Sequence, residues 1–212
     1  MFFFLLASVF LTVSCVRQAN ETQSMQKVPS TYIIVYKTTV DQPNLKSQSL
    51  MTQWVDNIAQ KYAVQTSTVL EINGSTQSGE SLMISRDGWN FVLNLQTKKG
   101  FKTKEEKNEK LTKAYLKPAE EETLRNAIES EGGKIRGKEF FLGFECMVAE
   151  LPERDESGQE LNSTIWYYKG IPLKMSNRNY TMEAISFEAD IPIPEQHFQV
   201  PDDVEITMIP AL

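Results

Sequence analysis

Few side chains in this sequence are of the types that carry covalent chemistry. There are two cysteines, Cys15 and Cys146, and one histidine, His197. A catalytic thiol needs a base beside it, and His197 lies far from either cysteine without a motif around it. Cys146 lies in the apolar run 140–148, so we expect a buried free cysteine that behaves as a small hydrophobic side chain. The phosphate-loop, dinucleotide and Gly-x-Ser-x-Gly motifs do not occur in the sequence.

Metal binding finds little support either. Structural and catalytic zinc sites use closely spaced His and Cys ligands, which one histidine and one remaining thiol cannot supply. A carboxylate-only calcium site within residues 155–160 is the alternative. We therefore predict no metal, no cofactor and no enzymatic activity.

Cys15 has a clearer chemical role, because it follows an apolar run that begins at the first residue. Residues 1–13 would form a helix of only about 20 Å, too short for a hydrocarbon core of about 30 Å but suited to a signal peptide. The segment Leu11–Cys15 resembles a bacterial lipoprotein cleavage site. We therefore expect residues 1–14 to be a signal peptide and Cys15 to be lipidated, so that the protein is anchored to a membrane of the bacterial envelope. The alternative is an ordinary secretory signal cut near Ser14, with Cys15 incidental.

Composition predicts a globular domain behind this signal. Hydrophobic residues make up 41% of the chain and charged residues 24%, with a net charge of −6, which argues against nucleic acid as a partner. Residues 98–117 contain eight lysines and three glutamates. This basic stretch could contact anionic lipid headgroups or an acidic partner; the alternative is a solvated hairpin end and loop.

The pattern of apolar residues predicts a mainly β domain of residues 31–212 that follows a polar, flexible tether of residues 15–30. β-Branched and aromatic residues, alternation and turn signals predict strands and turns in an antiparallel meander. A helix is expected from Pro118 to Ser130, with proline at its first position and Gly132-Gly133 as its stop. The predicted strands cover residues 32–38, 49–56, 63–72, 81–84, 89–95, 163–170, 171–175 and 180–191. Residues 137–151 form one long strand or a bent pair with a possible bulge at Gly143, turns fall at 73–74, 86–88 and 98–100, and a short helical turn ends at Phe198.

Each of the three tryptophans falls in a predicted strand. Trp54, Trp89 and Trp166 either line an apolar cavity that binds a ligand or pack the sheet against its helix. Four Asn-x-Ser/Thr sequons, listed here by their first residue, would accept glycans in a eukaryotic secreted protein and are chance matches in a bacterial lipoprotein: Asn20, Asn73, Asn162 and Asn179.

A family resemblance is visible in the last third of the sequence. The segments Phe141–Cys146, Ile165–Lys174 and Phe198–Ile206, together with Trp89–Lys102, resemble the lipoprotein-localisation-factor (Lol) superfamily, especially its lipid-anchored envelope members common in Bacteroidetes. The resemblance implies an incomplete antiparallel β-barrel, in which a strongly curved sheet has its concave face covered by helices. It further implies an apolar hollow that binds acyl chains or lipoproteins.

Two functions are therefore predicted. The first is a lipid-anchored envelope protein that binds or carries a lipid or a lipoprotein acyl chain in the hollow of the half-barrel. The second is a non-catalytic structural or protein-interaction module of the envelope whose core is filled by its own side chains. The sequence does not indicate an oligomeric state.

Overall fold

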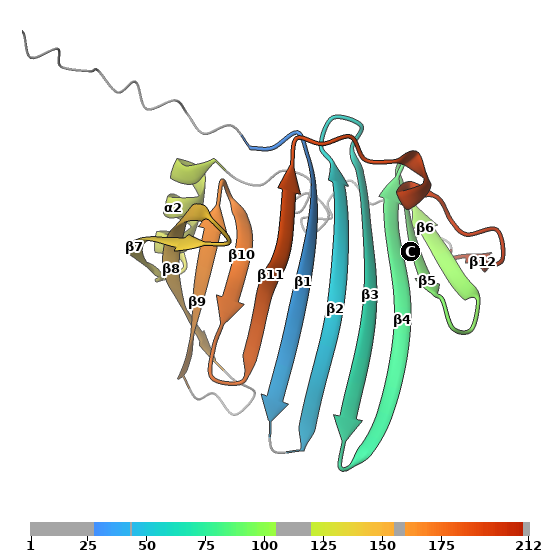
Figure 1. Cartoon of the computed structure of the whole chain (residues 1–212), viewed down its shortest axis with the longest axis horizontal. Helices are drawn as coiled ribbons and strands as arrows, with labels where there is room; N and C mark the ends of the chain where they lie inside the picture. The colour runs from blue at the N-terminus through green and yellow to red at the C-terminus, as the bar shows by residue number, and fades with distance from the viewer. Residues whose placement is uncertain (1–27, 43, 105–119, 155–159, 210–212) are drawn as a thin grey trace, which may run out of the picture.

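A computed structural model describes residues 28–42, 44–104, 120–154 and 160–209 of the chain. Within these residues, twelve strands form one sheet, accompanied by helix α2 (Glu121–Ser130) and the 3₁₀ turn η1 (Glu195–Phe198) (Figure 1). The strands are β1 (Thr31–Gln42), β2 (Leu45–Asp56), β3 (Lys61–Ile72), β4 (Ser75–Arg86), β5 (Trp89–Asn94), β6 (Lys99–Lys104), β7 (Lys134–Phe141), β8 (Phe144–Arg154), β9 (Glu160–Tyr168), β10 (Ile171–Ser176), β11 (Tyr180–Ala189) and β12 (Glu205–Met208). The mainly β prediction is confirmed.

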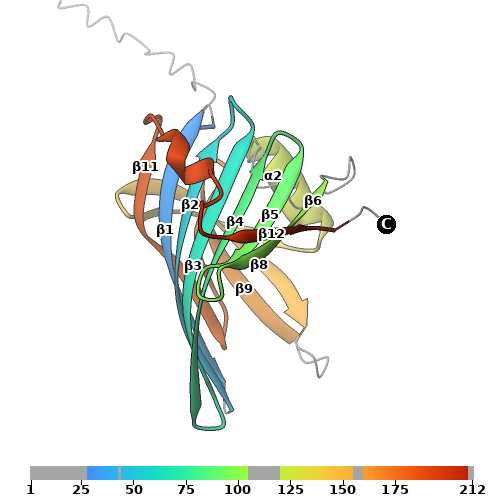
Figure 2. The same ribbon diagram turned by 90° about the vertical axis from the view of Figure 1, so that its right-hand side faces the viewer.

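The sheet is two meanders joined side by side rather than one. Its strand order is β12-β6-β5-β4-β3-β2-β1-β11-β10-β9-β8-β7, so β1 of the first meander pairs with β11 of the second. Among the described residues, every strand pair is antiparallel except β6 with β12, which is parallel. Because β7 and β12 lie at opposite ends of this order, the sheet is open. Figure 2 shows that it is also curved, with β6 and β9 displaced to the same side of β1.

Tight two-residue turns close several of the hairpins. Asn73-Gly74 and Asp87-Gly88, both predicted as turns, have positive φ at both positions, as type I′ hairpin turns require. The bulge predicted at Gly143 is wrong. Gly143 follows Leu142 in a two-residue turn of this kind between β7 and β8. The bulge of this hairpin lies instead between Ile135 and Gly137. Because the turn separates β7 from β8, residues 137–151 form a pair of strands.

Strands β6 and β12, which pair with each other, were also only partly predicted. The turn expected at residues 98–100 overlaps the start of strand β6, and β12 was not predicted at all. The short helical turn ending at Phe198 is confirmed as η1. Residues 105–117 of the basic stretch, Pro118 and the calcium alternative at 155–159 lie outside the described residues.

Burial divides into three clusters along the curved sheet. The largest lies on β1–β3 and β8–β11 and includes Ile34, Tyr36 and Leu173. A second forms where Phe198 of η1 and Val204 pack on β3, β4 and β5. The third forms where Ile128 of α2 packs on Met147 and Ala149 of β8. A single layer of sheet can bury apolar side chains only where it bends on itself or is covered, and these clusters mark those places.

Helix α2 ends as its sequence predicts. Gly132 has φ of +79°, and the amides of Gly132 and Gly133 donate to the carbonyl oxygens of Glu129 and Ile128 at 3.0 and 2.8 Å. These two bonds define the Schellman motif that glycine favours. The helix packs on β7 and β8 at one end of the sheet, and a helix that covers the concave face stays a prediction.

The described domain begins before the predicted end of the tether. Pro29 is buried and its carbonyl oxygen accepts a hydrogen bond from Asn57 Nδ2 at 2.8 Å. The amide of Ser30 donates to Asp190 Oδ1 at 2.9 Å. Residues 29–30 therefore belong to the domain, whereas the predicted signal peptide and Cys15 lie outside the described residues. No helix within the described ranges is long and apolar enough to cross a membrane.

Candidate ligand groove

The three tryptophans proposed to line a cavity lie in three separate places. Trp54 on β2 is half-buried and stacks on His197, with ring centroids 4.5 Å apart and planes 13° apart. Trp89 begins β5, with Lys102 Nζ 5.1 Å from its ring centroid. Trp166 on β9 donates from Nε1 to Glu139 Oε2 at 2.8 Å. The structure therefore does not bring them together around one hollow, and a role in ligand binding stays a prediction for each.

Cys146 is where the sequence predicts it, fully buried in β8 as a free cysteine. Its Sγ lies 3.5 Å from the carbonyl oxygen of Phe144. Burial raises the pKa of the thiol from 9.0 to about 11, because a thiolate loses its hydration in an apolar surrounding. At neutral pH Cys146 is therefore a thiol within the core.

This burial leads to a prediction for the reactivity of Cys146. In the folded protein with Cys15 replaced by serine, we expect Ellman's reagent at pH 8 to leave Cys146 unmodified until the domain unfolds. Because burial raises the pKa of the Cys146 thiol, the free energy of unfolding keeps its full value below pH 9 and falls as the pH rises from 9 through about 11. Urea unfolding at pH 8 and pH 10.5, for the protein with and without Cys146→Ala, checks the pH dependence. Rapid labelling without denaturant would contradict the expectation.

The other shifted pKa values also belong to β1, β7, β8 and β9. Burial raises the pKa of Tyr32 and of Tyr167. A hydrogen bond from the Arg136 guanidinium lowers the pKa of Glu150 on the neighbouring strand. In the described part of the chain, no group of three or more His, Cys, Asp or Glu side chains could hold a metal ion.

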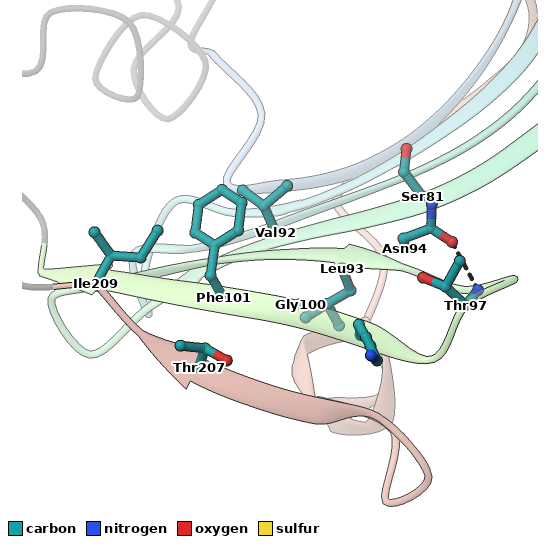
Figure 3. A pocket seen from close by; sticks show the side chains of 10 residues that line it. Ser81, Val92, Leu93, Asn94, Thr97, Gly100, Phe101, Thr207 and Ile209 are labelled. Atoms are coloured by element: carbon teal, nitrogen blue, oxygen red, sulfur yellow. Dashed lines mark hydrogen bonds between the residues drawn. The ribbon is translucent and has the colours of Figure 1, made fainter.

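A groove lies at the other end of the sheet, on β4, β5, β6 and β12. Its volume is about 530 Å³, within the range of about 300–1,000 Å³ typical of small-molecule sites. Val92, Phe101 and Ile209 supply its apolar surface, while Ser81, Asn94 and Thr97 supply polar groups (Figure 3). Lys99 and Thr207 also line it. The arrangement suits an apolar chain that carries a polar or anionic group.

The strand register explains why this surface is apolar. Side chains alternate between the two faces of a strand, so Ala63, Ile84 and Leu93 meet Phe198 on one face. Their neighbours Val64, Met83, Val92 and Phe101 point to the opposite face and lie side by side across β3, β4, β5 and β6. We call these four residues the groove row.

Exposure changes abruptly along this line of residues. Ile34 and Gln53 continue the groove row onto β1 and β2. Ile34 and Val64 are 0% and 7% exposed, whereas Met83, Val92 and Phe101 are 37–38% exposed. The apolar surface is therefore already buried on β1–β3 and becomes accessible from β4 onwards.

Two local features bring β5 and β6 together along the groove. Asn94 Oδ1 accepts hydrogen bonds from the amides of Gln96 and Thr97, at 3.0 and 2.8 Å, and so fixes the turn between the strands. Gly100 allows close approach, because a Cβ there would lie 2.6 Å from Leu93 Cδ2 and 2.7 Å from the carbonyl oxygen of Val92. The turn and the glycine together set Phe101 opposite Val92.

The groove was not predicted from the sequence. Val92 lies in a predicted strand, but Phe101 follows residues predicted as a turn, and Ile209 follows a strand that was not predicted. The available signal was Phe101 itself, a large aromatic side chain among lysines in a segment that was interpreted by its charge.

Comparison with known proteins gives the fold but no sequence family. No protein-family model matches the chain, and no curated protein matches its sequence. An uncharacterized conserved protein from Thermus thermophilus matches over 86% of this chain and 92% of its own, with 8% identity and a TM-score of 0.52. This likeness shows a shared fold.

Two further structures are less similar. The MucA/MucB complex of Pseudomonas aeruginosa contains a chain with a TM-score of 0.45 and 13% identity, matched over 84% of this chain but 58% of that one. A domain assigned to outer-membrane lipoprotein sorting from Vibrio parahaemolyticus has a TM-score of 0.27 and 12% identity, over 83% of this chain and 92% of that one. TM-scores below 0.5 do not establish a common fold, so neither similarity bears on function.

Proposed function

We propose that the protein is a lipid-anchored protein of the bacterial cell envelope that binds a hydrophobic ligand, a lipid or a lipoprotein acyl chain, on the inner surface of its open sheet. The observation that carries this proposal is the accessible part of the groove row, where Met83, Val92 and Phe101 lie in register on three neighbouring strands. Burial of apolar surface contributes about 0.8 kcal/mol per methylene. Six methylenes of an acyl chain would thus contribute about 5 kcal/mol.

The protein-interaction module remains a second candidate because of the buried half of the same surface. On β1–β3 the side chains are already inaccessible, with Ile34, Val55 and Tyr62 at 0–2% exposure. A half-barrel whose middle is filled offers a ligand less room than one that is hollow throughout. The groove on β4–β6 and β12 would then contact a partner protein.

Mass spectrometry of lipids that co-purify with the protein tests the proposal. The chain should begin at residue 15 and carry Cys15→Ser, so that acyl groups of the anchor itself are absent from the extract. We expect an acyl lipid at close to one molecule per protein after purification without detergent. A lipid-free protein that also fails to take up fatty acid or phospholipid from added vesicles would favour the interaction module.

The anchor has its own prediction. Replacing Cys15 with serine in the full chain is expected to move the protein from the membrane fraction to the soluble envelope fraction, because stable attachment would depend on the acylated cysteine. Immunoblots of separated fractions check this, with Cys146→Ser as the matched control, which should stay with the membrane. Membrane association unchanged by Cys15→Ser would rule the anchor out.

A further inference from the structure

We propose that one end of the sheet is a docking surface for an anionic lipid bilayer. It comprises the β2–β3 turn and the neighbouring end of β4, β5 and β6. This docking end is separate from the ligand groove. The proposal therefore does not depend on which of the two candidate functions is correct.

The chain enters the domain at this end. Thr31, the first residue of β1, pairs with Asp56, the last of β2. The β2–β3 turn that follows is bonded to the preceding residues: Asn57 donates from its side chain to the carbonyl oxygen of Pro29, at 2.8 Å, and from its backbone to that of Ser30, at 2.9 Å. A chain tethered to a membrane through residues before 28 would therefore present this end to the bilayer.

The β2–β3 turn carries a strongly exposed apolar side chain. Ile58 is 78% exposed, the highest exposure of any large hydrophobic residue among those described. Asp56 Oδ1 accepts hydrogen bonds from the amides of Ile58 and Ala59, at 3.0 and 2.8 Å, and so holds the turn in shape. A fixed turn that projects an isoleucine can insert it into a lipid interface with little ordering cost.

Basic and aromatic side chains stand beside this turn. Trp89 pairs with Arg86 of β4 on one side and Lys104 of β6 on the other, so the three lie in one row on one face. Lys102 Nζ is 5.1 Å from the Trp89 ring, and the Arg86 guanidinium carbon is 6.0 Å from the Phe91 ring. None of the ion pairs found between described residues involves Arg86, Lys102 or Lys104.

The exposed Met208, the last residue of β12, completes the docking end. Met208 lies opposite Lys102 and is exposed. The amide of Ile209 donates to the carbonyl oxygen of Lys102 at 3.0 Å, while its side chain lines the ligand groove and is not part of the docking end. Lysines beside exposed apolar groups are typical of surfaces that lie in the lipid interface, where the apolar parts insert and the charges reach the headgroups.

Charge and shape together favour a bilayer over an acidic protein. The chain as a whole has a net charge of −6, whereas at this end Arg86, Lys102 and Lys104 outnumber the two aspartates of the turns, Asp56 and Asp87. An anionic membrane attracts each basic residue near its surface, and tryptophan prefers the headgroup region. Ile58 and Met208 would add nothing to a purely electrostatic contact, but at a lipid surface they add apolar burial.

Vesicle co-sedimentation tests the docking end, with the chain from residue 15 that carries Cys15→Ser. Every described element lies after residue 27, so this chain contains them all. The vesicles are phosphatidylcholine alone or phosphatidylcholine with one quarter phosphatidylglycerol. We expect at least fivefold stronger binding to the anionic vesicles at low salt, weakening as added salt screens the charges.

Matched variants at the two ends of the sheet locate the surface. Arg86→Glu with Lys104→Glu should weaken binding to anionic vesicles at least tenfold, whereas Lys37→Glu with Lys46→Glu, the same charge change towards the far end, should leave it within twofold. Ile58→Ser should weaken binding about threefold and Ile72→Ser, at the β3–β4 turn, should not. Circular dichroism and thermal melts confirm that each variant is folded.

Three results would overturn the proposal. One is equal binding to neutral and anionic vesicles. Another is an equal loss from the far-end variants. The third is binding to a soluble polyanion such as heparin without binding to vesicles, which would indicate an acidic macromolecule as partner. Lipid that co-purifies in the groove bears on the proposed function and not on this surface, so either proposal can fail without the other.

Discussion

Replacing Phe198 with alanine is expected to lower the free energy of unfolding by about 3–5 kcal/mol, the usual cost of removing a buried phenylalanine. Phe198 is 1% exposed and packs with Ala63, Ile84 and Leu93 on β3, β4 and β5. These strands expose the groove row on their other face and have little else to pack against. Removing the ring therefore leaves a cavity under the strands that carry the groove.

Urea unfolding followed by tryptophan fluorescence measures this loss. Gln196→Ala is the matched control within η1, because Gln196 is exposed and surface substitutions usually change stability by less than about 0.5 kcal/mol. His197→Ala is expected to fall between the two, since it removes the stack on Trp54. If Phe198→Ala were no more harmful than Gln196→Ala, the C-terminal segment would not be part of the core.

This contribution of η1 illustrates what the sequence could and could not predict. The strand at residues 32–38 was predictable because β-branched and aromatic residues follow one another there. In β4, by contrast, only residues 81–84 were predicted, although the strand runs from Ser75 to Arg86. Its first part is polar and mostly exposed, so it lacks the alternation by which a half-buried strand is recognised.

Local sequence patterns could not predict the pairing of strands that lie far apart in the sequence. Nothing in residues 205–208 alone predicts that they pair in parallel with β6, which lies far earlier in the chain. The joining of the two meanders through β1 and β11 is equally non-local. The resemblance to the Lol superfamily led to the curved, open sheet, while the composition of individual segments led only to its strands.

At the candidate site, too, local sequence predicted the setting of some residues and not of others. Cys146 could be predicted as a buried thiol because it lies in the mainly apolar run 140–148. The tryptophans could not be placed, because a large aromatic residue in a strand is equally at home under a covering segment, as Trp54 is beneath His197, or at a rim, as Trp89 is beside Lys102. The groove combines residues from β4, β5, β6 and β12, so it exists only once the register is known.

Replacing Val92 with aspartate is expected to weaken binding of a fluorescent fatty acid by about tenfold or more, which corresponds to about 1.4 kcal/mol. Val92 lies between Met83 and Phe101 in the groove row. A bound acyl chain would displace water from the new carboxylate, and an ion without a compensating partner is costly to desolvate. Stability should change little, because the side chain is 37% exposed.

Val69→Asp is the matched control for this substitution. Val69 is an exposed valine in the middle of a strand, 50% exposed on β3, and points to the face opposite the groove row. The same change of charge and size there should leave the affinity for the fatty acid within twofold, as measured by fluorescence titration. Equal losses in both variants would show that added negative charge alone repels the probe. Unchanged binding in Val92→Asp would mean that the ligand does not lie along the groove row.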